Sequence, residues 1–224
     1  MDKDLLICSP HEYYSEANQD NIAKLCKREN RQWIYSLIDA GSAAHDEIVM
    51  TETAQWLLCL DKHPGEDTRY LVVFRDLALK TLRDLRAADV GMLREVLDGV
   101  RAEMRTRQPE WAGCLVYFHY YPSVYQLHAH VCEDKGRTPQ RDASCRSHHV
   151  GHVIRNLERD SAWYAKALIL TNRPKHVFRA ESRAMRPPEL LGVRWEALGG
   201  GLRCSRTCEK PEKAETVRRC WAAI

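Results

Sequence analysis

The sequence lacks several features that would have fixed its class at once. No apolar run approaches the roughly 20 residues that a membrane-spanning helix needs. The first apolar run, Leu5–Cys8, has four residues and follows Asp2 and Asp4, which does not fit a signal peptide. No Cys-x-x-Cys pair and no internal repeat occur. We therefore expect no membrane partner, and a cytoplasmic location with the nucleus as a second site.

Charge is unevenly divided along the chain. Residues 1–172 hold 22 Lys and Arg against 25 Asp and Glu, a net charge of −3, and residues 173–224 hold 12 against 6, a net charge of +6. A slightly acidic body is not a nucleic-acid-binding surface by charge alone. With 44% hydrophobic and 29% charged residues, the chain can form an ordinary globular core. Its nine cysteines are scattered and odd in number, which indicates reduced thiols.

Hydrophobic spacing predicts short strands mixed with helices. The expected strands are 48–50, 56–60, 70–74, 114–121, 124–131 and 167–170. The expected helices are 21–28, 32–38, 81–107 and 148–158. Asp84 or Asp89 would cap the long helix and Pro109 would close it. Hairpin-like spacing with one long and one shorter helix indicates an α+β fold around a largely antiparallel sheet.

This pattern divides the chain into three parts. Residues 1–30 form a polar N-terminal extension, residues 31–172 form the folded domain, and residues 173–224 form a basic tail. The tail contains adjacent prolines, three adjacent glycines and scattered arginines without a sustained period. We therefore expect disorder or loose helix in the tail.

The segment Gln126–Cys132 carries the clearest chemical signal. Alternate side chains of a strand share a face, which would place on one face Gln126, His128, His130 and Cys132. The opposite face, toward the core, would hold Leu127, Ala129 and Val131. Two imidazoles at this spacing stand about 7 Å apart, which suits a grip on one phosphate chain. One neutral ring can attack phosphorus, because the ordinary pKa of histidine lies near ~6.5.

Two further groups can reach the same place. His119 ends the preceding strand, and the break at Pro122-Ser123 would fold it back toward His128. Ser123 offers a hydroxyl and backbone N–H groups at the turn for contact with an anion. A protonated histidine would supply the proton that a leaving phosphate needs.

Two other interpretations of these residues stay open. Polar residues that alternate with apolar ones are common on half-exposed strands and need have no function. A zinc site is the other interpretation, with one ligand set of His128, His130 and Cys132. A second set is Cys145, His148, His149 and His152, because His148 and His152 have the i, i+4 spacing of helical ligands. Cys204 and Cys208 in the tail form a weaker pair, without histidines nearby.

Several segments in order resemble one known family. Gln126–Cys132 resembles the histidine triad motif, and its surroundings are similar to those of the scavenger mRNA decapping enzymes. The segment 119–130 resembles their His-Tyr-x-Pro-Ser-Tyr-Tyr-His-x-His-x-His signature. Shorter resemblances lie at Gln32–Tyr35, Leu82–Leu85 and Val153–Glu158. Together they cover about residues 31–172 and imply a histidine-triad (HIT-like) α+β domain.

The resemblance implies a reaction. These enzymes hydrolyse 7-methylguanosine cap dinucleotides or short capped remnants of mRNA decay, releasing 7-methyl-GMP and a remnant that ends in a nucleoside diphosphate. His128 would be the nucleophile and would form a covalent nucleotidyl-histidine, which water then cleaves. The family requires no metal or other cofactor, and its members are homodimers.

The same resemblance implies the site residues. The catalytic set would be His128, His130, His119 and Gln126. The substrate-binding set would be Trp33, Asp61, Lys62, His63, Ser123, Tyr125 and Arg146. Trp33 would stack on the cationic methylated guanine, a contact worth ~0.5–2 kcal/mol.

The sequence also departs from the family pattern. Gln126 replaces the first triad histidine, and Val124 stands where the family has a tyrosine. Ala43-Ala44-His45 aligns with the glutamate by which the family recognises guanine, and Asp46 and Glu47 are the acidic residues that follow it. The chain begins 32 residues before Trp33, which predicts that the family's N-terminal domain is largely absent. These departures keep two alternatives in view. One is a general histidine triad nucleotide hydrolase with an open pocket, and the other is a cap- or nucleotide-binding protein without turnover.

Overall fold

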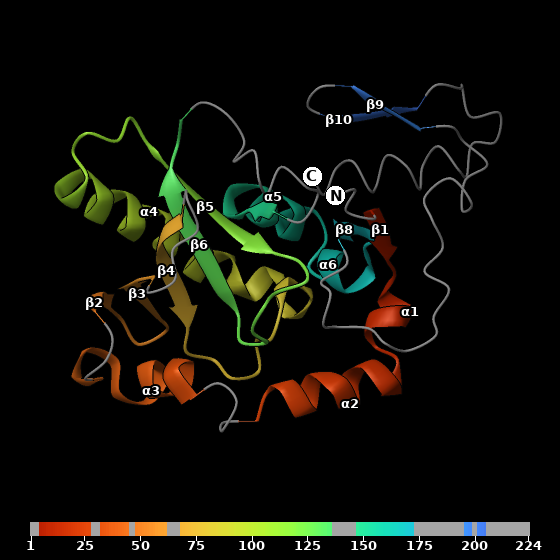
Figure 1. Cartoon of the computed structure of the whole chain (residues 1–224), viewed down its shortest axis with the longest axis horizontal. Coiled ribbons are helices and arrows are strands. Elements are labelled where there is room, and N and C mark those ends of the chain that lie inside the picture. Colours follow the sequence, from red (N-terminus) through yellow and green to blue (C-terminus); the bar gives the residue numbers. More distant parts are fainter. Residues whose placement is uncertain are drawn as a thin grey trace.

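A computed structural model describes seven ranges of the chain: residues 5–27, 32–44, 48–61, 68–135, 147–172, 195–198 and 201–204. Its centre is a six-stranded antiparallel sheet in the order β2-β3-β4-β6-β5-β7. In that order the strands are Val49–Glu52, Trp56–Leu60, Thr68–Phe74, His128–Glu133, Cys114–His119 and Ser147–His149. The long helix α4 (Val90–Arg107) and the shorter helix α5 (Val150–Arg159) complete the expected α+β fold, which is confirmed (Figure 1).

The sheet separates two hydrophobic clusters. The larger cluster joins Val72, Ala129 and Val131 to the buried sides of α4 and α5. The smaller one packs α3 (Gln32–Ala40) against β3 and β4 on the opposite face. Successive residues of β4 alternate between the clusters, with Leu71 and Val73 in the smaller one, as strand geometry requires.

The N-terminal elements pack onto this body. Strand β1 (Leu5–Cys8) pairs antiparallel with β8 (Ile169–Asn172), outside the main sheet. Helices α1 (Pro10–Tyr13) and α2 (Glu16–Leu25) follow, and Tyr13 and Ile22 are buried in the larger cluster. Short helix α6 (Trp163–Lys166) precedes β8. The segment expected to be a polar extension therefore contributes side chains to the main core.

Several element boundaries differ from the sequence prediction, and the long helix differs most. It begins at Val90, because residues 81–89 form two separate 3₁₀ turns, Leu82–Asp84 and Ala87–Asp89. Asp84 accepts the backbone N–H groups of Thr81 at 2.8 Å and Lys80 at 2.9 Å. The carboxylates thus stabilise the turns themselves, and the prediction of one helix over 81–107 is wrong in its first part.

Three other predicted elements are shifted. The helix expected at 148–158 is preceded by strand β7, so His148 and His149 lie on a strand. The helix expected at 21–28 lies earlier, at Glu16–Leu25. The strand expected from Val124 begins at His128, because Leu127 donates its N–H to the carbonyl of Leu79 outside the ladder.

The tail contains regular structure where an irregular segment was expected. Strands β9 (Trp195–Leu198) and β10 (Gly201–Cys204) pair antiparallel with each other. Across the described ranges, no helix is long and apolar enough to cross a membrane.

Candidate active site

The predicted alternation of β6 is confirmed. Ala129 and Val131 are fully buried in the larger cluster, between the sheet and helices α4 and α5. His128 and His130 therefore lie on the other face, where they are opposite Val73 and Leu71 of β4. Period-two alternation thus places two imidazoles on the face that carries α3.

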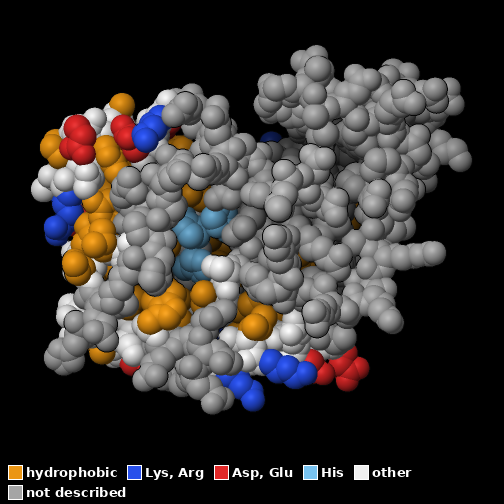
Figure 2. All heavy atoms as spheres, viewed as in Figure 1, with side chains coloured by type: hydrophobic (Ala, Val, Ile, Leu, Met, Phe, Trp, Pro, Cys, Tyr) orange, Lys and Arg blue, Asp and Glu red, His pale blue; other side chains and the backbone are white. Residues whose placement is uncertain are grey.

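Three histidines and a tyrosine form one cluster on this face. The ring centroids of His128 and His130 are 5.3 Å apart, and those of His130 and His119 are 4.3 Å apart. Tyr117, which is nearly fully buried, stacks on His130 at 5.6 Å and contacts His119 at 5.3 Å. Figure 2 shows histidine side chains gathered in one place on the surface, beside hydrophobic side chains. The structure therefore brings together the three histidines that the sequence singled out.

One hydrogen bond fixes the tautomer of His128. Its Nδ1 lies 2.7 Å from the backbone carbonyl oxygen of Gln126. A carbonyl oxygen can only accept, so Nδ1 carries the proton and Nε2 carries the lone pair. The ring is 6% exposed, so its orientation is held by packing as well. His128 is thus prepared to act through Nε2.

Gln126 contributes through both its side-chain amide and its backbone carbonyl. Its amide nitrogen donates to the carbonyl of Phe74, the last residue of β4, at 2.8 Å and to that of Asp76 at 3.0 Å. This side chain is fully buried. The side-chain amide therefore fixes the segment just before β6 to the end of β4. This places the backbone carbonyl of Gln126, which orients the ring of His128.

A buried arginine anchors the segment that follows His119. Arg83 is fully buried and donates from Nε to the phenol oxygen of Tyr120 at 2.6 Å. Its other nitrogens donate to the carbonyls of Tyr164, Ala167 and Cys8 at 2.8 to 3.0 Å. The sulfur of Cys8 also lies 3.3 Å from the Tyr120 hydroxyl. Arg83 thus connects β1, α6 and the end of β5, and so holds the loop that carries Ser123.

Trp33 is exposed on the helix that covers the histidine face of the sheet. Its neighbours Ile34 and Leu37 are fully buried against β3 and β4, whereas Trp33 itself is 39% exposed. Helical geometry explains the difference, because the buried face of α3, which holds Ile34, Tyr35, Leu37 and Ile38, is centred about 120° round the helix from Trp33. Trp33 is therefore not a core residue, and its ring is accessible.

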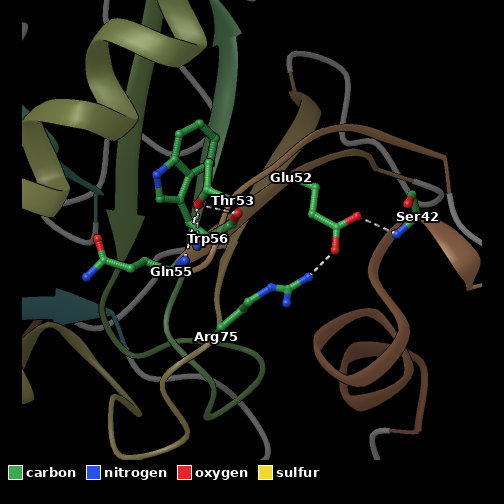
Figure 3. Close-up of polar contacts among 6 residues, drawn as sticks. All are labelled: Ser42, Glu52, Thr53, Gln55, Trp56 and Arg75. Atoms are coloured by element: carbon green, nitrogen blue, oxygen red, sulfur yellow. Dashed lines mark hydrogen bonds and ion pairs between the residues drawn. The ribbon is translucent and has the colours of Figure 1, made fainter.

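An ionic contact fastens the end of this helix to the sheet (Figure 3). The Glu52 carboxylate accepts the backbone N–H of Ser42 at 3.0 Å and pairs with Arg75, which follows β4. The Ser42 N–H, followed by the Arg75 charge, lowers the pKa of Glu52. In the adjoining turn, Thr53 Oγ1 accepts the N–H of Trp56 at 3.0 Å. Glu52, which sequence reasoning did not identify, therefore ties the turn after α3 to the sheet.

We expect Gly41→Ala to destabilise the protein by about 1–3 kcal/mol. Gly41 has a φ of +55°, and a Cβ there would collide with the Glu52 carboxylate. Gly91→Ala is the matched control, because a Cβ at Gly91 meets no atom within 4 Å, and alanine should stabilise α4 by about 0.5–1 kcal/mol. Urea unfolding of both variants measures the difference, and equal stabilities would contradict the role of Gly41.

The remaining predicted site residues do not all lie beside the histidine cluster. Ser123 is exposed in the loop before β6, and Asp61 is partly buried directly after β3. The ring of Tyr125 is buried in the larger cluster rather than among the histidines, and burial raises the pKa of its hydroxyl. Three more predicted residues fall outside the described ranges, namely Lys62, His63 and Arg146.

The zinc interpretation finds no support in the described ranges. They contain no group of three or more His, Cys, Asp or Glu side chains arranged to hold a metal ion. His148 is on β7 and His152 on α5, so the expected helical i, i+4 pair does not exist. Cys145 and Cys208 lie outside the described residues.

The sequence prediction did not place two neighbouring residues in this cluster. Tyr117 precedes His119 by two residues, so strand alternation alone would have placed both on one face. His149 was assigned to a helix, yet it lies on β7 opposite Tyr117, with ring centroids 6.2 Å apart. Both residues extend the ring cluster toward the edge of the sheet.

The antiparallel sheet, the covering helices and the histidines of β5 and β6 together define a histidine-triad-like domain. The chain belongs to the family described as scavenger mRNA decapping enzyme C-term binding, whose model matches residues 32–145, about half of the chain. That range contains α3, the whole loop before β6 and all three clustered histidines.

Curated relatives agree with this assignment. The chain is similar to the m7GpppX diphosphatase of Bos taurus, with 29% identity over 146 residues that cover 60% of this chain and 42% of the bovine protein. It is 26% identical over 144 residues to the Homo sapiens m7GpppX diphosphatase, covering 59% and 41%. With the Ascaris suum m7GpppX diphosphatase it shares 29% over 146 residues, covering 62% and 48%. The matched region thus spans less than half the length of these relatives.

Proposed function

We propose that this chain hydrolyses the 5′–5′ triphosphate bridge of 7-methylguanosine cap dinucleotides or short capped mRNA remnants. It acts as a hydrolase on an acid anhydride bond and releases 7-methyl-GMP. The family membership and the m7GpppX diphosphatase activity for which the relatives are named support this substrate class. The observation that carries the proposal is the fixed tautomer of His128 beside His130 and His119.

The reaction proceeds in two displacements. In the first, Nε2 of His128 attacks the phosphorus next to 7-methylguanosine, a P–N bond forms, and the P–O bond to the remaining diphosphate breaks. Nδ1 stays protonated, and its bond to the Gln126 carbonyl stabilises the positive charge that the ring gains. In the second, water attacks the same phosphorus and gives its proton to the imidazole that protonated the diphosphate, the P–N bond breaks, and 7-methyl-GMP leaves.

His130 and His119 bind the phosphate oxygens of the substrate. Their rings lie 4.3 Å apart beside His128, on the side of the sheet that α3 covers. Imidazole N–H groups donate hydrogen bonds to oxygens that gain charge in the transition state, and a protonated ring gives a proton to the leaving diphosphate. Tyr117 keeps His130 in place by stacking on it.

Trp33 supplies recognition of the base. Its exposed ring lies on the helix that covers the histidine face, and the methylated guanine carries a positive charge that favours an aromatic ring, by ~0.5–2 kcal/mol. Among the described residues, Asp61 and Ser123 are the other accessible members of the proposed substrate-binding set. We further propose a homodimer located in the cytoplasm and the nucleus, on the strength of the family resemblance.

The test is turnover of a cap dinucleotide by the purified full chain without added metal. We expect release of 7-methyl-GMP and a nucleoside diphosphate. Binding of the dinucleotide without release, by a folded protein, would overturn hydrolysis and identify a binding protein. Faster cleavage of dinucleoside polyphosphates or nucleoside phosphoramidates that lack the methyl group would identify a general nucleotide hydrolase instead.

A further inference from the structure

A row of rings continues from the proposed catalytic histidines to the edge of the sheet. Tyr117 of β5 lies opposite His130 of β6 and also opposite His149 of β7. Residues opposite each other in neighbouring strands share a face, so these three rings stand side by side. His149 then contacts His152 in the first turn of α5, with ring centroids 5.8 Å apart.

The two outer histidines are accessible, and both a cationic and an anionic side chain lie near them. His149 and His152 are both partly exposed. The first turn of α5 contains no acidic residue, and the Arg155 guanidinium lies beside it, 3.9 Å from where a Cβ on Gly151 would stand. Burial first, and then the neighbouring His152, lower the pKa of His149, while Asp134 opposes them. Each ring, when neutral, still carries one N–H group that can be donated to a phosphate oxygen placed between them.

The position of the pair along the sheet suggests which part of the substrate it meets. Trp33 belongs to the helix on β3 and β4, the reacting His128 lies on β6, and His149 lies two strands further, on β7. Two strand spacings amount to about 10 Å. A substrate stacked on Trp33 and attacked by His128 therefore directs its other end toward His149.

We propose that His149 and His152 form a second phosphate subsite, which binds the nucleoside diphosphate end of the departing RNA remnant. This inference rests on the proposed function, because it assigns the leaving half of the same substrate. The two imidazoles donate N–H groups to the phosphate oxygens, and Tyr117 separates this subsite from His130. No covalent step occurs at the subsite.

The experiment is calorimetric titration of the full chain with ADP and, separately, with 7-methyl-GMP. We expect the double variant His149→Gln/His152→Gln to raise the Kd of ADP about tenfold or more, the cost of one or two hydrogen bonds to a charged group, and to leave the Kd of 7-methyl-GMP unchanged. His11→Gln is the matched control, since His11 is exposed on α1. Circular dichroism confirms that each variant is folded.

The outcomes separate the subsite from the hydrolysis. An unchanged Kd for ADP in the double variant, or no ADP binding by the wild-type chain, overturns the subsite. Stoichiometric zinc binding that the double variant loses, without an effect on ADP, overturns it in favour of a metal site. ADP binding through these histidines in a chain that does not cleave cap dinucleotide supports the subsite and refutes the proposed function.

Discussion

His128→Ala is expected to reduce cap dinucleotide turnover by at least about 10³-fold, because no other group replaces the attacking nitrogen. The wild-type ring is oriented by the Gln126 carbonyl and is almost completely buried, so the variant loses a positioned nucleophile. Rapid quenching of the wild-type reaction in alkaline denaturant, which preserves the acid-labile P–N bond, followed by mass spectrometry should detect the nucleotidyl adduct, and the variant should show none. Release of 7-methyl-GMP in single turnovers gives the rate.

His11→Ala provides the control for this change, since it removes an exposed imidazole from α1. Its turnover should equal that of the wild type. The nucleophile assignment is refuted if His128→Ala retains turnover within tenfold of the wild type while folded. Turnover that falls without any trapped adduct in the wild-type reaction would instead favour direct attack by water.

Arg83→Met should have the largest effect on stability, a loss of about 3 kcal/mol or more in the free energy of unfolding. Four hydrogen bonds disappear, and three carbonyl oxygens and the Tyr120 hydroxyl lose a donor in the interior. The guanidinium carbon also lies 5.0 Å from the ring centroid of Tyr120 and 5.4 Å from that of Tyr13. Urea unfolding followed by tryptophan fluorescence measures the loss.

Arg94→Met is the matched substitution on the surface. Arg94 pairs with Glu158, and both side chains are well exposed, so its loss should cost at most about 1 kcal/mol. Similar urea midpoints of unfolding for the two variants would show that the buried contacts of Arg83 contribute little to the stability of the protein. Because Arg83 holds the segment after His119, a folded Arg83→Met protein should also show reduced turnover.

The strand carrying His128 and His130 could be predicted from the sequence, because side chains of a strand alternate whatever surrounds it. The same rule placed Ala129 and Val131 in the core. The long helix was predicted too far toward the N-terminus. In residues 81–89 the local carboxylates of Asp84 and Asp89 close 3₁₀ turns, and Arg83 is drawn into the interior by acceptors distant in the chain.

His149 shows why the rest of the site could not be predicted. Its spacing with His152 and Val153 looks helical, yet pairing with β5 makes residues 147–149 a strand, and that pairing joins segments about 30 residues apart. The role of Glu52 could not be predicted for the same reason. Its carboxylate contacts Ser42 and Arg75, which come from two other segments of the chain.

The sequence by itself determined the fold class and, through the alternation of polar and apolar residues, which side chains of β6 face the core. It also determined the family, through motifs that occur in the family's order. These depend on local periodicity and on residue types, which the chain carries everywhere along its length. Only the tertiary structure decided the tautomer of His128, the exposure of Trp33, the burial of Tyr125 and the row of rings that ends at His152. Each of these results from contacts between distant segments, whose geometry is fixed only when the sheet and the core have formed.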